Sequence, residues 1–561
     1  MVITTVLQVM LLIGTLVVLA VPVGHYLTKV FTGSLKCSLE KWFYRLLGID
    51  ETREMSWKTY AFSLLVFNVI GIVAMFVLQL AQSLLPLNPQ KFGAVRWDTA
   101  LNTAISFVTN TNWQAYSGEA TMSYFTQMLG MTVQNFLSAA VGMAASIAFI
   151  RGFIRKTSEA VGSFWVDLTR SILYVLLPLS ILLSLIFVSQ GMIQNFKPYL
   201  TVKTLEGHEQ VIAQGPVASQ EAIKQLGTNG GGFFNANASH PYENPTPLTD
   251  YLEIIGLLLI AAALPLTFGA MLKNRKQGWA IFAAMLILYL VGLTGVIMAE
   301  FQSNPILAEF GIERGANMEG KEVRFGRLAS VVFAQSTTTT SCGAVNSMHD
   351  SFMPLTGLVL LFNIMVGEAI FGGVGVGLIS MLMYAILTMF LVGLMIGRTP
   401  EIFGKKLEPY EMIMAVIAIV LPSVIQLLSG AIAASSSFGL SSLNNAGPHG
   451  LSEILYAFAS GAGNNGSAFA GLNANTIFYN LTLAFAMLVG RFSTIIPALA
   501  IAGSLAKKKM THESSRFPTD SPLFVIILIS TVLIVGALTF FPVLVLGPIL
   551  EHLALFAGKV F

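Results

Sequence analysis

The sequence has little charge for its length. Only 11% of its 561 residues are charged, whereas 55% are hydrophobic, and the net charge is +3. A soluble domain carries about 25% charged residues, so this chain cannot cover a water-facing surface of its size. The composition excludes a soluble enzyme, a nucleic-acid-binding protein and a disordered protein. It predicts a polytopic membrane protein.

Sequence motifs for catalysis are also missing. Cys37 and Cys342 are the only cysteines, too few for a disulfide framework. The sequence has no Gly-x-x-x-x-Gly-Lys-Ser/Thr phosphate loop, no Asp-Lys-Thr-Gly phosphorylation motif and no zinc-binding helix motif. The seven histidines are scattered, and we interpret the neighbours His349 and Asp350 as a loop cap rather than a metal site. The chain is therefore predicted to be no enzyme and to need no cofactor.

Long apolar runs define the expected spans, since about 20 apolar residues in a helix cross the hydrocarbon core. Ten runs qualify: 4–28, 59–86, 126–150, 171–190, 251–272, 279–300, 352–396, 412–434, 477–505 and 521–548. The first run has no basic residue before it and no small-residue cleavage site after it. We expect a retained helix there rather than a cleaved signal.

The run 352–396 is long enough for two spans but is counted once. It contains Gly372, Gly373, Gly375 and Gly377, a cluster that predicts a break in the helix. Broken backbone at membrane depth occurs only where it is buried in protein or lines a cavity. The alternative is an unbroken helix with a glycine-rich packing face.

The distribution of basic residues predicts the orientation, because Lys and Arg prefer cytoplasmic loops. If the chain begins outside, the inside segments hold about twice as many Lys and Arg residues as the outside segments. Counting 352–396 twice would move Arg398, Lys405 and Lys406 outside and break this pattern. Both termini are therefore expected to be external.

Four of the outside segments contain a polar, glycine-rich stretch that follows a short helix. The stretches are 109–114, 228–232, 340–344 and 463–467, and the helices expected before them are 97–108, 219–226, 325–336 and 451–462. Such helices are too short to span and fit re-entrant pore helices, whose negative C-terminal ends point into the membrane. One such stretch alone would be interpreted as an external turn. Four at regular spacing predict four parallel repeats around a pore.

The residue types in these stretches suit a monovalent cation. Gly, Asn, Thr and Ser leave backbone carbonyls free and add side-chain oxygens. A ring of carbonyls can replace the hydration shell of a large cation. The stretches contain no carboxylate, which Mg²⁺ or Ca²⁺ would usually recruit. They favour K⁺ or Na⁺, and K⁺ of the two.

The sequence resembles the KdpA family, the potassium-binding subunits of the bacterial Kdp P-type potassium-transporting ATPase. The resemblance covers essentially the whole chain and is carried by residues 102–119, 215–235, 317–325, 341–352, 393–400 and 447–469. It implies an all-α membrane protein of the Trk, Ktr and HKT superfamily. This fold has ten transmembrane helices, arranged as four span–pore helix–span repeats plus one extra helix at each end.

The resemblance implies a division of the chain into six parts. They are 1–58 (extra helix and cytoplasmic loop), 59–156, 157–276, 277–411 (the repeat with the broken second helix), 412–510 and 511–561 (the second extra helix). It also implies a K⁺ selectivity filter at Thr109, Asn110, Thr111, Asn112, Gln114, Thr228, Asn229, Gly230, Ser341, Cys342, Gly343, Asn464, Asn465 and Gly466. Gly466 departs from the family, which commonly has Asn there.

The implied function is uptake of periplasmic K⁺ across the bacterial inner membrane. The chain would bind K⁺ in the filter and deliver it to the ATP-hydrolysing subunit KdpB, in a complex with the small subunits KdpC and KdpF. K⁺ is then the transported ion rather than a cofactor, and the surroundings are lipid, not nucleic acid. The alternative is a stand-alone Trk- or Ktr-type channel-like protein that takes up K⁺ or Na⁺.

Charged residues inside the apolar runs are further candidates, since a charge there is costly and usually faces a cavity or a partner. We hypothesise that Arg491 and Glu368, with the glycine cluster 372–377, line the ion path below the filter. Arg491 would oppose leakage and Glu368 would draw the ion sideways to the pump subunit. The alternative is an ion pair that joins two repeats.

Residues outside the spans complete the expectations. Gln114 is expected at the outer mouth of the filter. Four loop carboxylates could concentrate cations there, or form an ordinary solvated loop: Glu206, Glu209, Glu221 and Glu243.

Overall fold

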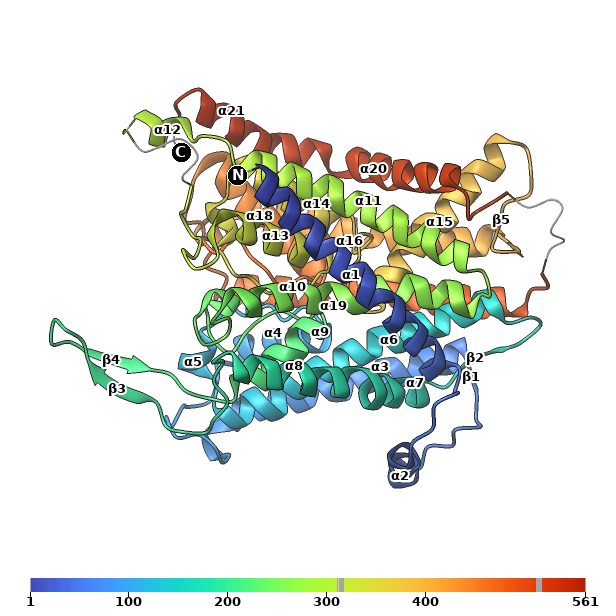
Figure 1. The fold of residues 1–561 in the computed structure, drawn as a ribbon, viewed down its shortest axis with the longest axis horizontal. Coiled ribbons are helices and arrows are strands. Elements are labelled where there is room, and N and C mark those ends of the chain that lie inside the picture. The colour runs from blue at the N-terminus through green and yellow to red at the C-terminus, as the bar shows by residue number, and fades with distance from the viewer. Residues whose placement is uncertain (1, 310, 312–316, 511–516, 560–561) are drawn as a thin grey trace.

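The protein is a bundle of long helices with short helices inserted between them (Figure 1). The computed structural model describes residues 2–309, 311, 317–510 and 517–559. Within these residues, ten helical segments are long and apolar enough to cross a membrane. The predicted class, an all-α polytopic membrane protein, is confirmed.

The ten segments are as follows. They are α1 (Val2–Phe31), α3 (Trp57–Leu80), η2–α6 (Thr126–Thr132 and Val133–Ile154), α7–η3–α8 (Phe164–Arg170, Ser171–Leu176 and Leu177–Ser189), α10 (Pro247–Met271), α11 (Arg275–Glu300) with α12 (Pro305–Glu309), α15 (Val376–Met395), α16 (Pro409–Ser435), α19 (Ile477–Lys507) and α20–η7–α21 (Pro522–Leu544, Val545–Ile549 and Leu550–Phe556). The segments η2, η3 and η7 are π-helical turns within continuous helices.

Local sequence explains where several spans begin. The side chain of Ser56 accepts a hydrogen bond from the Thr59 amide at the start of α3, and Ser521 does the same for Phe524 at the start of α20. Thr246 and Thr249 form a capping box ahead of α10, with Pro247 in the first turn. Such caps satisfy amides that have no partner inside the helix.

Shorter elements connect the spans. The short helices are α2 (Ser38–Leu47), η1 (Gln82–Leu84), α4 (Trp97–Val108), α5 (Gly118–Thr121), α9 (Val217–Leu226), η4 (Asn237–Ser239), α13 (Gly326–Thr339), η5 (His349–Ser351), α14 (Pro354–Met365), α17 (Ser437–Leu440) and α18 (Gly447–Ala462). The described part of the chain has three antiparallel pairs of strands: β1 (Met55–Ser56) with β2 (Ala160–Gly162), β3 (Leu200–Lys203) with β4 (Glu209–Ile212), and β5 (Glu401–Ile402) with β6 (Lys405–Lys406). The hydrophobic pattern did not predict α2 or these pairs.

Burial separates an inner from an outer layer of helices. In an 18-residue apolar stretch of each inner helix, 83% of the residues are buried for α6 and α10 and 72% for α15 and α19. The corresponding buried share is 22% for α3, 44% for α11, 39% for α16 and 17% for α1, which form the outer layer. The apolar outer face of such a bundle suits lipid, because a water-facing helix would carry a polar stripe.

The predicted interruption of the 352–396 run is present. Helix α14 ends at Met365, α15 begins at Val376, and the segment 366–375 between them is not helical. Gly372, Gly373 and Gly375 lie in this segment, whereas Gly377 lies in the first turn of α15. The break therefore starts before the glycine cluster. We call residues 366–375 the intramembrane segment.

Both chain ends lie at one end of the bundle, with the β3–β4 hairpin, while α2, β1 and β5 lie at the opposite end (Figure 1). We call the first the hairpin end and the second the α2 end. The helices α4, α9, α13 and α18 are inserted from the hairpin end between the two spans of a pair. The predicted 97–108 agrees with α4, whereas α9, α13 and α18 differ from the expected bounds by up to four residues.

Candidate functional site

The four inserted helices end in the same backbone turn. In each, the third residue after the helix donates its amide to a carbonyl in the last turn of the helix. These bonds are Thr111 N to Ser106 O (2.9 Å), Asn229 N to Lys224 O (2.9 Å), Cys342 N to Thr337 O (3.1 Å) and Asn465 N to Ser460 O (2.8 Å). This is the long bond of a Schellman motif. We call residues 109–112, 227–230, 340–343 and 463–466 the ring segments 1 to 4.

The backbone of each ring segment enters the left-handed region twice. The second residues have φ values of 64° (Asn110), 47° (Thr228), 48° (Ser341) and 50° (Asn464), and the fourth residues have 54° (Asn112), 84° (Gly230), 81° (Gly343) and 98° (Gly466). Thr and Ser rarely adopt this conformation. Such a residue costs on the order of 1–3 kcal/mol and is found mainly at functional sites. Different side chains are therefore held in one repeated backbone shape.

The glycines of the ring segments allow the four segments to meet. A Cβ atom on Gly230 would overlap the Cys342 carbonyl, and one on Gly343 would overlap the Asn465 carbonyl. One on Gly466 would overlap the Thr111 carbonyl. Segment 2 thus touches segment 3, segment 3 touches segment 4, and segment 4 touches segment 1.

The remaining contact closes the ring. The amide nitrogen Nδ2 of Asn112 donates to the Gly230 carbonyl at 3.1 Å, which joins segment 1 to segment 2. The side chain of Asn110 donates to the Thr228 carbonyl at 2.8 Å and accepts from Asn229 Nδ2 at 2.7 Å. Residues far apart in the sequence therefore surround a single axis.

Side-chain amides brace the ring in its other half as well. Asn464 Nδ2 donates to Thr111 Oγ1 at 2.9 Å, and Asn465 Nδ2 donates to the Thr337 carbonyl at 2.9 Å. Asn464 thus reaches ring segment 1, and Asn465 reaches the last turn of α13 before ring segment 3. The asparagines hold the backbone in place at least as much as they add oxygens.

The ring is neutral and buried. Asn112, Asn229 and Ser341 are at most 2% exposed, and each has a side-chain oxygen that accepts no hydrogen bond from a described protein group. Burial raises the pKa of the Cys342 thiol to about 11, so this group is uncharged at neutral pH. Neutral oxygens without donors are suited to a weakly hydrated cation.

Gln114 lies just beyond ring segment 1. Its Nε2 donates to the Gly232 carbonyl at 3.1 Å, and its Oε1 accepts from the Gly232 amide at 2.9 Å. This two-way pair links the chain after segment 1 to the chain after segment 2. The hydrogen bonds of Gln114 therefore reach Gly232, which lies just after ring segment 2.

A buried ionic cluster supports ring segment 2, and sequence reasoning missed it. Lys224 Nζ lies 2.6 Å from Glu221, 3.1 Å from Glu243 and 2.8 Å from Asn237 Oδ1. Asn237 in turn donates to the Gly231 carbonyl. The Glu-x-x-Lys spacing on the short helix α9 was the available clue, since side chains three apart meet on a helix.

This cluster corrects one expectation. Glu221 and Glu243 are at most 1% exposed and are paired with Lys224, so the hypothesis that they attract cations from solution is wrong. Glu206 and Glu209 are exposed, at the β3–β4 hairpin.

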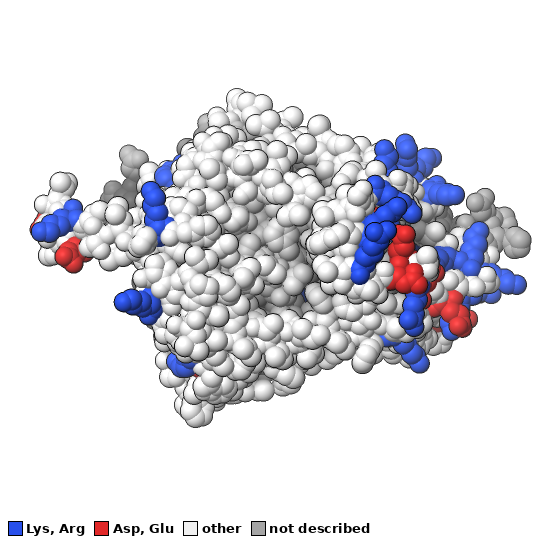
Figure 2. Space-filling view, turned by 90° about the horizontal axis from the view of Figure 1, so that it is seen from below, with Lys and Arg blue, Asp and Glu red and all other residues white. Residues whose placement is uncertain are grey.

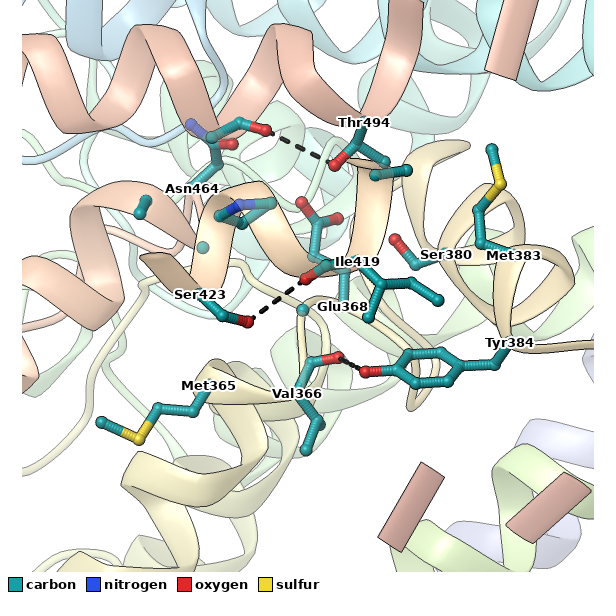
Figure 3. Close-up of a pocket in the computed structure, with 16 residues that line it drawn as sticks. Met365, Val366, Glu368, Ser380, Met383, Tyr384, Ile419, Ser423, Asn464 and Thr494 are labelled. Carbon is teal, nitrogen blue, oxygen red and sulfur yellow. Dashed lines mark hydrogen bonds between the residues drawn. The ribbon is translucent and has the colours of Figure 1, made fainter. Parts of the chain in front are cut away.

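Glu368 faces a cavity beside the ring. Its Oε2 accepts a hydrogen bond from the Gly373 amide at 2.9 Å, and the next residue, Val374, donates to Thr228 Oγ1 at 2.9 Å. The cavity is small, about 20 Å³, and lies between the intramembrane segment, α15, α16, α19 and the end of α18. Figure 3 shows the Glu368 carboxylate on the side of the cavity where Asn464 and Thr494 lie. The intramembrane segment thus touches ring segment 2 and borders ring segment 4.

Arg491 is buried on α19 and contacts the opposite inner helix. Its Nη2 donates to the Ser138 carbonyl on α6 at 3.1 Å, and its Nε has no partner among the described residues. Ser138 also donates to Asn110 of ring segment 1 at 2.8 Å. Within the described residues Arg491 and Glu368 form no direct salt bridge, so the geometry differs from the alternative of an ion pair between repeats.

Gly375 permits the close approach of the intramembrane segment to α6. Its φ is 91°, and a Cβ atom there would overlap the Gly142 carbonyl. Gly142 lies one turn after Ser138 and faces Arg491. Arg491 and the intramembrane segment that carries Glu368 are therefore both placed against the same part of α6.

Comparison with known proteins identifies relatives over the whole length. The profile of the family described as "Potassium-transporting ATPase A subunit" (KdpA) matches residues 10–553. Curated proteins named "Potassium-transporting ATPase potassium-binding subunit" are similar. Those of Koribacter versatilis and Paramagnetospirillum magneticum are 52% and 55% identical, and each alignment covers 99% of both chains. That of Methylorubrum extorquens is 54% identical over 99% of this chain and 98% of the relative.

A solved structure is similar in fold. The crystal structure of the potassium transporter TrkH from Vibrio parahaemolyticus matches with a TM-score of 0.53 and 13% sequence identity. The match covers 79% of this chain and 84% of TrkH. At this identity the likeness concerns the fold alone.

Proposed function

The chain belongs to the KdpA family of potassium-transporting ATPase A subunits, and from this premise we propose that it binds K⁺ within the ring and passes it to an ATP-hydrolysing partner. The family predicted from the sequence is confirmed. The curated relatives are named for binding potassium and for belonging to a transporting ATPase. The proposal assigns both properties to this chain and gives each a location.

The closed, neutral ring is the observation that carries the proposal. Four segments with one backbone shape meet around an axis, and no carboxylate or basic side chain belongs to them. The C-terminal, negative ends of α4, α9, α13 and α18 converge on the same place. A site of this type lowers the free energy of a dehydrated monovalent cation without the charge that a divalent ion demands.

The proposed filter comprises the ring residues, with Gln114 at its outer mouth. The residues are Thr109, Asn110, Thr111, Asn112, Thr228, Asn229, Gly230, Ser341, Cys342, Gly343, Asn464, Asn465 and Gly466. Their backbone carbonyls are the proposed ligands, because the asparagine amides already brace neighbouring segments.

Below the ring, we propose that the ion turns aside rather than continuing straight on. Arg491 is a buried cation held against Ser138, directly behind ring segment 1. It would repel K⁺, because like charges in a medium of low polarity interact strongly. Glu368 borders the small cavity between the intramembrane segment and α16. In this proposal the cavity marks the start of a route toward a partner subunit. The flexible glycines of the intramembrane segment would let the route open and close.

The proposed location is the bacterial inner membrane, with the hairpin end outside. Figure 2 shows Lys and Arg gathered mainly at the α2 end of the visible face, beyond a broad uncharged belt. This asymmetry supports a cytoplasmic α2 end. Both termini would then be external, and the six-part division with boundaries after 58, 156, 276, 411 and 510 remains our proposal.

The proposed partners are KdpB, which would hydrolyse ATP, and the small subunits KdpC and KdpF. The chain itself would be the non-catalytic, ion-selecting subunit. The alternative, a stand-alone Trk- or Ktr-type uptake protein, draws support only from the fold likeness to TrkH.

The test is K⁺-stimulated ATPase activity of the complex purified through a tag on this chain. We expect an ATPase subunit to co-purify and its activity to depend on K⁺. The variant Gly230→Asp should change which cations stimulate turnover, whereas Gly207→Asp, which adds the same charge at an open turn between β3 and β4, should not. K⁺ uptake by the isolated chain without an ATPase would support the alternative. An unchanged cation preference in Gly230→Asp would remove the ring from the site.

A further inference from the structure

A second group of metal-ligating side chains lies at the hairpin end, away from the ring. One ligand atom from each of Asp350, His449 and Glu453 lies within 4.8 Å of the other two. Asp350 belongs to η5, which follows ring segment 3, while His449 and Glu453 are on α18, which leads into ring segment 4. We propose that these three residues form a binding site for a divalent transition-metal ion of the Zn²⁺ class.

The contacts of His449 resemble those of a metal-ligating histidine. Its Nε2 lies 2.9 Å from Asp350 Oδ1, and its Nδ1 lies 2.8 Å from a carboxylate oxygen of Glu551 on α21. A carboxylate on the second ring nitrogen is the usual partner that orients a zinc-binding histidine. Glu551 would serve in this role and His449 Nε2 would bind the ion.

The spacing of the ligand atoms is close to that of a zinc site. Zinc–nitrogen and zinc–oxygen bonds of about 2.0 Å place the ligands of a tetrahedral ion about 3.3 Å apart. The His449–Asp350 pair is already at 2.9 Å. Gly471 lies beside both carboxylates, and its missing side chain leaves room near Asp350 and Glu453. The ligand atom of Glu453 lies within 4.8 Å of the other two and would move toward them to complete the site.

The charge of the cluster also favours a cation. Asp350 and Glu551 contact one imidazole, and Glu453 has a ligand atom within 4.8 Å of it; within the described residues no Lys or Arg forms a salt bridge with any of the three carboxylates. Glu453 is fully buried and is held only by neutral amides of Asn444 and Asn445. A buried carboxylate without a cationic partner is costly.

A metal at Nε2 would replace a hydrogen bond. Both ring nitrogens of His449 are within hydrogen-bond distance of a carboxylate, Nε2 with Asp350 and Nδ1 with Glu551. An imidazole nitrogen that binds a metal carries no proton, so the ion would take the place of the hydrogen shared with Asp350. Asp350, Asn445, His449 and Glu551 also line an open cavity at the surface, which gives the ion a way in and supplies water as a fourth ligand.

The experiment is Zn²⁺ titration of the purified complex against a chromophoric chelator. We expect one tight site per complex. His449→Asn should weaken it by at least about 100-fold, and Glu551→Gln by about 10- to 100-fold, the range for lost orienting partners. His552→Asn, next to Glu551 on α21, is the matched control and should bind as wild type does. Equal affinity in wild type and His449→Asn, or no binding in wild type, would overturn the site.

A spectroscopic measurement covers the case in which His449→Asn does not assemble. X-ray absorption of the Zn²⁺-loaded wild-type complex should give one imidazole and otherwise oxygen ligands at about 2.0 Å. Two or more imidazoles, or a sulfur ligand, would place the ion elsewhere and exclude the proposal.

Discussion

The ring repeats one backbone conformation four times, whereas the layer beneath it consists of unequal helices. In the ring, four segments with different side chains share one sequence of backbone conformations and one terminating hydrogen bond. Beneath the ring, the helices differ: the intramembrane segment separates α14 from α15, while α19 continues unbroken for 31 residues and carries Arg491.

Under the proposed function, this difference separates ion binding, which the ring performs, from the choice of ion path, which the layer beneath it makes. Surrounding one ion evenly requires equivalent groups, whereas sending it to one side requires that the groups below be unequal. Buried lysines also differ in what they support: Lys224 lies in the cluster behind segment 2, whereas Lys321 pairs with Glu300, which accepts from the Met353 amide after segment 3. The predictions below remove one kind of feature at a time.

The largest effect is expected from Lys224→Met. The change leaves Glu221 and Glu243 buried without their cation, which costs about 3–5 kcal/mol. Chemical or thermal unfolding of the complex would measure the loss. Lys507→Met is the control, because its pair with Glu159 is largely exposed and such pairs contribute about 0–1 kcal/mol. Equal losses in the two variants would mean that the cluster does not support segment 2.

The next effect is expected from Gly343→Ala, which breaks the equivalence of the ring. The new Cβ would overlap the Asn465 carbonyl and push segment 4 away. A displacement of about 1 Å at a site of this kind can cost about 100-fold in function. We therefore expect the K⁺ concentration for half-maximal ATPase activity to rise about 100-fold. In the control Gly295→Ala the nearest atom is a Val359 methyl at 3.4 Å. A normal K⁺ requirement in Gly343→Ala would contradict a tight ring.

A smaller effect is expected from Gln114→Arg at the proposed mouth. The added cation should weaken apparent K⁺ affinity about tenfold, equal to about 1.4 kcal/mol. Gln114→Leu removes the pair with Gly232 but adds no charge, so it separates repulsion from lost bracing. If both variants weaken K⁺ binding equally, the mouth position is structural and electrostatic repulsion plays no part.

Arg491→Ala tests the unequal layer and should affect coupling more than binding. We expect K⁺ affinity within about threefold of wild type, a change of only about 0.7 kcal/mol, and fewer K⁺ ions transported per ATP because the repelling charge is gone. Transport into proteoliposomes, measured beside ATP hydrolysis, gives this ratio. Arg491→Lys keeps the charge and should restore much of it. An unchanged ratio in Arg491→Ala would assign Arg491 a packing role only.

The fold class and the residues of the ring could be predicted from the sequence. Apolar runs gave all ten spans, because a lipid-facing helix must be apolar along its whole length. The polar stretches marked the ring segments because four clusters of Gly, Asn, Thr and Ser, each after a short helix, interrupt the apolar pattern at regular spacing. The glycine cluster marked the broken helix, although the structure begins the break earlier, at Val366.

Other features depended on contacts between residues distant in the sequence. Lys224 and Glu243 are 19 residues apart, and Asp350 and His449 are 99 apart, so no local pattern pairs them. The burial of Glu221 and Glu243, which the sequence suggested as solvent-facing, was decided by that pairing. Periodicity and composition determine which residues leave water. Only the tertiary structure decides which buried charges and carbonyls face one another, because that choice is made by packing between repeats.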